Sequence, residues 1–171
     1  DCLNDLRNLQ AAVDATNKTI TYTYKIASGD NGTLATTSYS GTVYDAVGNS
    51  LTAANKTIGG NAITADTTAP TLSSINVTSP AAGTYKAGQS VKIVATYSEN
   101  IYANTSKAAI ASATAPVLKI KFGSSTERTA TFSSVNGNQI TYTYTISSGD
   151  NGTLATTSYT GTVYDVAGNT L

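Results

Sequence analysis

The sequence contains no histidine, no tryptophan and no methionine, and Cys2 is its single cysteine. Without histidine, the chain lacks the side chain that most often acts as a general base near neutral pH. No nucleophile sits in a recognisable motif, and nothing pairs Glu99 and Glu127, the only glutamates, as an acid and a base. The sequence therefore predicts a protein that is not an enzyme, with no catalytic residues. Cys2 has no partner for a disulfide within the chain.

Charge is also scarce. Charged residues make up 12% of the 171 residues, and 10 basic side chains balance 10 acidic ones. Nucleic-acid binding depends on clustered Lys and Arg that neutralise phosphates, so a neutral chain argues against a nucleic-acid partner. No apolar run approaches the roughly 20 residues that span a bilayer, so we expect no membrane span.

The most informative feature that is present is a near-exact internal repeat. Residues 140–171, the second copy, repeat residues 20–51, the first copy, at a constant offset of 120 positions. Of the 32 aligned residues, 26 are identical, and the six differences are mild, such as Ser40 against Thr160. A repeat at a fixed period indicates an array of similar structural units.

Each copy opens with alternating β-branched and aromatic residues. In the second copy, Tyr142 and Tyr144 alternate with threonines, which is typical of a strand with one buried face. Turn-forming residues at 147–152 break this strand, and a second strand is expected at 159–164. The pattern predicts two neighbouring antiparallel strands joined by a rather long loop.

The segment before the first copy differs from the rest of the chain. Residues 1–16 carry leucines at helical spacing, and we interpret them as an N-terminal arm or short helix. In register with the repeat they align with residues 121–136, which favour a strand, so a diverged strand is the alternative.

The remainder divides at a linker. Residues 17–66 hold the first copy and a further strand-like run at 51–58. The sequence DTTAP then indicates a linker, because Pro70 cannot continue a strand ladder. Residues 67–171 carry six short strand patterns bounded by turns, which predict an immunoglobulin-like β-sandwich. The expected fold class is all-β, with one half unit followed by one nearly complete unit. The strand patterns lie at 72–78, 91–98, 118–122, 128–132, 140–146 and 159–164.

Several motifs in this order resemble the bacterial Ig-like tandem repeats of large cell-surface adhesins and extracellular repeat proteins. They are DTTAP at 66–70, GTYKAGQSVKIVATYSEN at 83–100, ITYTYTISSGD at 140–150 and VYDVAGN at 163–169. The resemblance covers residues 66–171 completely and residues 20–70 as the back half of a preceding unit. It implies an extracellular, cell-surface location and a structural role that extends or builds an adhesin or filament. The alternative is a module that binds a glycan or a protein, such as a host-cell ligand.

Strand direction brings four oxygen-bearing side chains to one end of the second unit. Asp66 lies in the linker, Glu99 follows the second strand, and Asp165 and Asn169 follow the sixth, so all four are expected at the linker end. Oxygen ligands from a linker and two loops suit Ca²⁺, which takes 6–8 of them. The resemblance also implies calcium, because such repeats often stiffen their junctions with it. The alternative is that these residues cap turns by bonding their own backbone.

The end of the second copy suggests how units associate. The first copy continues into a further strand-like run, whereas the second copy stops at Leu171, which leaves one edge beside residues 159–164 without a final strand. An open edge is a template for another chain, so we expect a strand donated by a neighbouring copy or an adjacent repeat. Contacts of this head-to-tail kind build filaments when they do not close.

Overall fold

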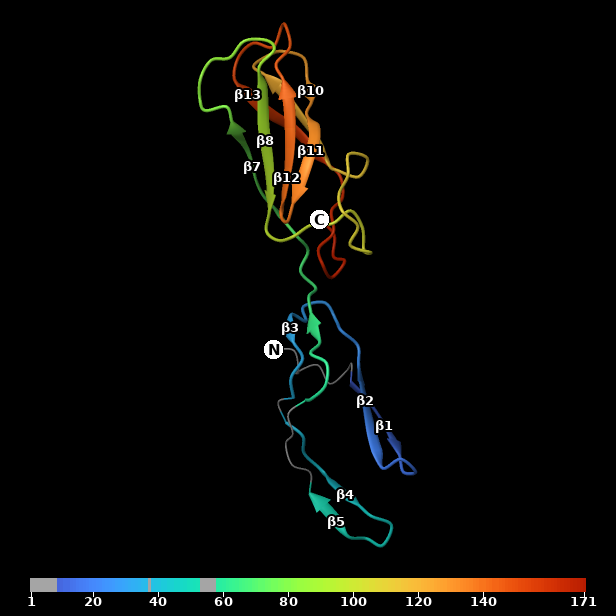
Figure 1. Cartoon of the computed structure of the whole chain (residues 1–171). Helices are drawn as coiled ribbons and strands as arrows, with labels where there is room; N and C mark the ends of the chain where they lie inside the picture. The colour runs from blue at the N-terminus through green and yellow to red at the C-terminus, as the bar shows by residue number, and fades with distance from the viewer. Residues whose placement is uncertain (1–8, 37, 53–57) are drawn as a thin grey trace. The chain divides into compact units, whose positions relative to one another are not determined.

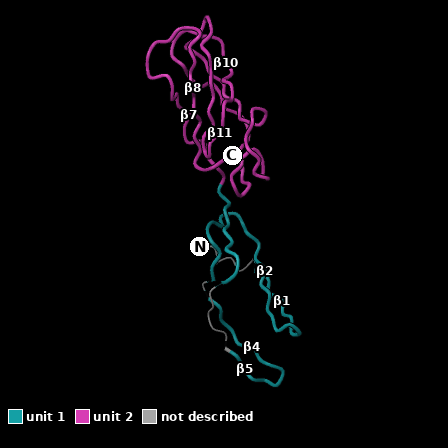
Figure 2. The backbone as a smooth tube through the Cα atoms, viewed as in Figure 1, with its two compact units in different colours: residues 1–68 teal, residues 69–171 magenta. Residues whose placement is uncertain are grey.

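The computed structural model describes residues 9–36, 38–52 and 58–171, and every regular element within them is a β-strand. The chain divides into unit 1, residues 1–68, and unit 2, residues 69–171 (Figure 2). All strand pairs are antiparallel. Among the described residues, no helix has the length and apolarity needed to cross a membrane.

Unit 2 contains a four-stranded sheet with the order β11-β12-β8-β7 (Figure 1). Its central pair, β12 and β8, keeps one register from Gln139 opposite Thr96 to Thr145 opposite Ser90. A second, three-stranded sheet has the order β10-β9-β13. The strands of the first sheet are β7 (Leu72–Ser79), β8 (Ser90–Tyr97), β11 (Thr131–Asn136) and β12 (Gln139–Thr145). Those of the second are β9 (Val117–Phe122), β10 (Arg128–Thr129) and β13 (Leu154–Thr160).

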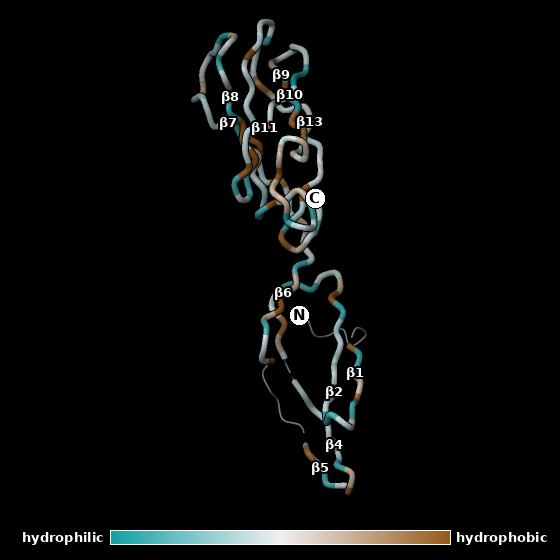
Figure 3. Tube along the Cα trace, turned by 45° about the vertical axis from the view of Figure 1, so that its right-hand side comes forward, coloured by the Kyte–Doolittle hydropathy of each residue, from teal (hydrophilic) through white to brown (hydrophobic). Residues whose placement is uncertain are grey.

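Alternating residues from both sheets of unit 2 meet in one hydrophobic core. β8 contributes Ile93 and Tyr97, β12 contributes Ile140 and Tyr142, and β9 contributes Leu118, and all five are buried. Hydrophobic and hydrophilic stretches follow one another along the tube of unit 2 (Figure 3). Two sheets that share one core make unit 2 all-β and sandwich-like, because each sheet hides its apolar face against the other.

Three tyrosine hydroxyls meet inside this core. The Tyr97 and Tyr159 oxygens lie 2.7 Å apart, and the Tyr142 hydroxyl lies 3.2 Å from that of Tyr159 while it donates to the Pro116 carbonyl at 2.7 Å. Buried polar atoms need such partners to offset their lost hydration. Burial also raises the pKa of Tyr142 to about 12.

The second copy does not form the neighbouring pair of strands that the sequence indicates. β12 belongs to the four-stranded sheet and β13 to the three-stranded one, so the two strands face each other across the core. β13 also lies earlier than the expected 159–164 and ends at Thr160. Gly161 follows with a φ of 144°, and a Cβ there would lie 2.7 Å from the Pro116 Cα, so this close approach ends the strand.

The predicted strand at 128–132 is divided between the two sheets. β10 pairs with β9, whereas β11 pairs with β12. Ala130 lies between them, is buried, and donates its N–H to the Leu118 carbonyl. The chain therefore crosses from one sheet to the other at this small residue, a change of partner that alternation alone does not reveal.

The described residues of unit 1 form three short strand pairs. β1 pairs with β2, β3 pairs with β6, and β4 pairs with β5. Their bounds are β1 (Leu9–Asp14), β2 (Thr19–Tyr24), β3 (Gly32–Thr33), β4 (Thr42–Tyr44), β5 (Ser50–Thr52) and β6 (Thr64–Ala65).

The helix considered for residues 1–16 is wrong where the structure describes them, and the strand alternative holds. Residues 9–14 form β1, because pairing with β2 overrides the helical spacing of the leucines, and residues 1–8 lie outside the described residues. Of the strand-like run at 51–58, the structure describes only Leu51, Thr52 and Ile58, and the first two close β5.

Candidate functional site

Two of the four residues predicted as metal ligands come together within unit 2. Glu99 and Asp165 each offer a carboxylate oxygen, and these two oxygens lie within 4.8 Å of one another, whereas Asp66 belongs to unit 1. Asp66 precedes Pro70 in the linker sequence, Glu99 follows β8, and Asp165 follows β13. The fourth predicted ligand, Asn169, contacts this group through Asp165, because its Nδ2 donates to Asp165 Oδ2 at 2.8 Å.

Asp165 is the best-defined member of the group. It is fully buried, and its Oδ1 accepts the backbone N–H groups of Ala167, Gly168 and Asn169 at 2.7–2.8 Å. Burial raises the pKa of Asp165, but the hydrogen bonds from Asn169, Gly168 and Ala167 lower it by more, so the pKa lies below its ordinary value. Asp165 is therefore a carboxylate that folds its own loop into a turn.

The first copy contains the same turn. Asp45 Oδ1 accepts the N–H groups of Val47 and Asn49 at 3.0 and 2.8 Å, and Asp45 Oδ2 accepts Asn49 Nδ2 at 2.8 Å. Among the described residues the acidic group found is the one around Asp165, and Asp45 is not part of it. Turn capping therefore explains the conformation of the Asp45 loop without a metal. This is the alternative that the sequence analysis gives for these residues.

A cation at Asp165 would need oxygens that the turn itself does not supply. Hard cations such as Ca²⁺ and Mg²⁺ bind carboxylate oxygens, and several carboxylates close together repel each other unless a cation or protons offset their charge. Glu99 provides additional charge within unit 2. The donor set fits a hard divalent cation, and it does not select calcium.

We expect chelation to destabilise unit 2 if a cation binds here. A ligand at a hundredfold excess over its dissociation constant stabilises the native state by about 2.7 kcal/mol. Thermal unfolding would be measured with millimolar Ca²⁺ and with EDTA, in the native chain and in Glu99→Gln. The native chain should melt lower in EDTA, and Glu99→Gln should respond less while it keeps the Asp165 turn. Identical melting in Ca²⁺ and EDTA would contradict the cation.

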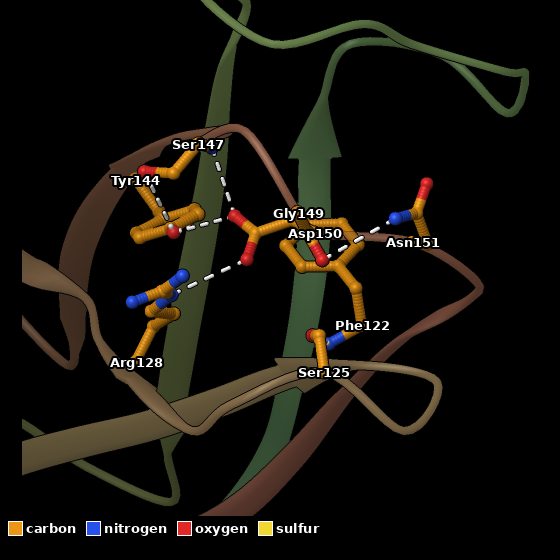
Figure 4. Close-up of polar contacts among 8 residues, drawn as sticks. All are labelled: Phe122, Ser125, Arg128, Tyr144, Ser147, Gly149, Asp150 and Asn151. Carbon is orange, nitrogen blue, oxygen red and sulfur yellow. Dashed lines mark hydrogen bonds and ion pairs between the residues drawn. The ribbon is translucent and has the colours of Figure 1, made fainter.

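A second polar cluster lies around the loop after β12 (Figure 4). Asp150 Oδ2 accepts the Tyr144 hydroxyl at 2.6 Å and the Ser147 N–H at 2.8 Å, while Asp150 Oδ1 accepts Arg128 Nε at 3.2 Å. The Tyr144 hydrogen bond is the main cause that holds the pKa of Asp150 below its usual range. The three donors satisfy the Asp150 carboxylate, whose side chain is wholly shielded from solvent.

The sequence analysis did not predict this polar cluster, because the sequence indicates only a turn at 150–152. The signal was present, because Tyr24 and Asp30 repeat the spacing of Tyr144 and Asp150 in the first copy. The Tyr24 hydroxyl donates to Asp30 Oδ2 at the same 2.6 Å. A tyrosine six residues before an Asp-Asn-Gly turn thus closes the loop in both copies.

A groove of 690 Å³ opens beside this loop in unit 2. Its walls include Val77, Tyr85, Phe122, Ile146 and Asn151. Such a volume lies within the range of small-molecule sites, and the mixed apolar and polar walls would admit a ligand with both kinds of surface.

No family model, curated protein or solved structure matches this chain.

Proposed function

We propose that this chain serves as a structural repeat of an extracellular, cell-surface adhesin or filament, and that its units are immunoglobulin-like. The observation that carries this proposal is the duplication. Two segments 120 positions apart share 26 of 32 residues and fold their Asp45 and Asp165 turns with the same hydrogen bonds. A recognition surface is rarely duplicated unchanged, whereas a spacer gains length from each added copy.

The sheet edges support association with neighbouring copies. β13 lies at an edge of its sheet, with β9 as its partner on the other side. In the first copy, the segment that follows returns to pair with β3, with Ala65 opposite Gly32 and Thr64 opposite Thr33. The equivalent of β3 in unit 2 is Gly152 and Thr153, directly before β13. We propose that a strand like β6 from an adjacent repeat or another copy adds here.

Chains carrying two, four and six joined copies of residues 52–171 would test the proposal. Each copy contributes one period of 120 residues. If the repeats extend a stalk, the radius of gyration from small-angle X-ray scattering should rise about threefold between two and six copies. A compact assembly grows as roughly the 0.38 power of chain length, which gives a rise of only about 1.5-fold. A rise near this lower value would contradict the structural role.

The groove beside β12 favours a second candidate, a module that binds a glycan or protein. Tyr85 is half-buried in its wall, with its hydroxyl donating to the Ala81 carbonyl at 2.6 Å. Aromatic walls with nearby polar groups suit sugars and peptides alike. A ligand that binds the native chain but does not bind the Tyr85→Ala variant would favour this candidate over the purely structural one.

A further inference from the structure

The two copies share two local geometries, a tyrosine ring pair and a capped loop, although they lie in different units. The rings of Tyr22 and Tyr39 meet edge to face at 6.1 Å and 87°, and the equivalent rings of Tyr142 and Tyr159 meet at 6.1 Å and 86°. The Asp30 and Asp150 loops carry the same pattern of bonds from a tyrosine hydroxyl and from the backbone N–H three residues earlier. Sequence identity therefore extends to local structure.

The exposure of the two copies is very different. Tyr22 is 46% exposed and Val43 is 42% exposed, whereas their equivalents Tyr142 and Val163 are each 1% exposed. Ile26 is 49% exposed, compared with 6% for Ile146. The same side chains thus form a core in unit 2 and an apolar surface in unit 1. Exposed apolar surface of this kind marks a place where another chain segment binds.

Unit 2 shows which chain segment covers this surface. β12 pairs with β8 on one edge and β11 on the other, whereas β2, within the part of the chain that the structure describes, pairs only with β1. β8 places Ile93 opposite Tyr142 and Val91 opposite Tyr144. β9 supplies further buried residues from the facing sheet. The cover comes from residues 69–120, which we call the front half.

The tyrosine cluster of unit 2 also includes a residue from the front half. In unit 2 the Tyr159 hydroxyl meets those of both Tyr142 and Tyr97, and Tyr97 comes from β8 in the front half. Tyr22 and Tyr39 keep the mutual geometry of two members of this cluster. The third member belongs to a strand of the β8 type, so the surface matches one sequence and not merely any apolar strand.

We propose that the open edge of β2, with the face formed by Tyr22, Ile26 and Val43, is a docking surface for a polypeptide with the sequence of the front half. The added strand runs antiparallel to β2 in the register of β8 on β12. Its Ile93 equivalent lies opposite Tyr22, and its Tyr97 equivalent lies beside the ring of Tyr39, as Tyr97 lies beside Tyr159 in unit 2. The partner is defined by this chemistry, whether it precedes unit 1 in the same chain or comes from another chain.

The inference rests on the proposed repeat function only for the nature of the partner. The covering segment is a repeat sequence, so an array would supply it at every unit. Strand addition combines main-chain hydrogen bonds along the edge with side-chain pockets that select the sequence. In this case the pockets are the spaces between the tyrosine and valine side chains that the front half fills in unit 2.

The test is a chain in which a second copy of residues 69–120 is fused directly before Asp1, so that the offset of 120 is kept. Hydrogen exchange read by mass spectrometry would follow β2 in this fusion and in the native chain. The substitutions between the copies, such as Lys25 against Thr145, distinguish their peptides. We expect exchange in β2 to slow by at least ~1,000-fold, because strands inside folded domains approach the full protection of global unfolding.

A matched fusion carries Ile93→Asp and Ala95→Asp in the added segment only. These changes place charges opposite Tyr22 and Ile20 and should return β2 to the exchange rate of the native chain, while β12 serves as an internal reference. Unchanged exchange of β2 in the first fusion, or equal protection in both fusions, would overturn the proposal. Multi-copy chains that scatter as compact particles would contradict the structural role without affecting this result, so the two failures are distinguishable.

Discussion

Tyr142→Ala is expected to lower the free energy of unfolding of unit 2 by about 3–5 kcal/mol, the range measured for large aromatic residues truncated in protein cores. Tyr142 is 1% exposed, and its ring meets that of Phe132 as well as that of Tyr159. The change also removes the hydroxyl that binds the Pro116 carbonyl, which leaves that carbonyl buried without this donor. Urea denaturation followed by circular dichroism would measure the loss.

The first copy provides the matched control. Tyr22→Ala removes the same side chain from the same local sequence, but Tyr22 is 46% exposed, and exposed positions usually change stability by no more than about 0.5 kcal/mol. Tyr142→Ala should therefore lower the unfolding midpoint of unit 2 strongly, whereas Tyr22→Ala should leave it unchanged. Equal effects of the two substitutions would show that the burial of the second copy is not the cause.

Asp165→Ala should destabilise unit 2 by about 3 kcal/mol. The buried carboxylate accepts four hydrogen bonds, and an unpaired buried donor costs roughly 1–3 kcal/mol. Asp45→Ala, which removes an exposed carboxylate from the same turn, should cost about 1 kcal/mol or less. Thermal unfolding of the two variants measures the difference, and an Asp165→Ala chain as stable as Asp45→Ala would contradict the role of burial.

The same carboxylates give this stability a pH dependence. The pKa values of Asp165 and Asp150 are lower in the folded chain than the ordinary value of 3.8, so their hydrogen bonds contribute fully above that value. The contribution is lost as the pH falls below 3.8 and through the lower, folded pKa values, because protonation removes the charge that the donors stabilise. The loss of stability below pH 4 should therefore be smaller in Asp165→Ala.

Alternation of residue type predicted the strands of unit 2 well, and it predicted their partners less well. β7, β8, β9 and β12 lie within a residue or two of the expected positions, and β8, β9 and β12 present side chains to the core at every second residue. The sheet to which each strand belongs depends on the crossing at Ala130 and the break at Gly161. Both are set by contacts with distant residues, which local periodicity does not encode.

The candidate site was likewise predictable only in part from the sequence. Strand direction was enough to bring Glu99 and Asp165 to one end of unit 2, because antiparallel neighbours return their loops to the same pole. Turn capping by Asp165 was the alternative that the sequence offered, and its hydrogen bonds depend on the backbone conformation at residues 167–169, which strand direction does not determine. The Tyr144–Asp150 contact was likewise hidden, although its repetition in both copies was a usable signal.

One consequence of the duplication concerns the order in which the chain assembles. Within residues 1–171, the front half lies between two nearly identical back halves. The front half is covered by the second copy in this structure, yet the face of the first copy offers the same side chains in the same geometry. Folding onto the first copy would give a circular permutant of unit 2, with the back half leading. The two isomers compete for the same strands, and near-identical neighbours in repeat proteins misassemble in this manner. Only six substitutions separate the copies, so a front half meets two nearly equivalent surfaces while the chain folds.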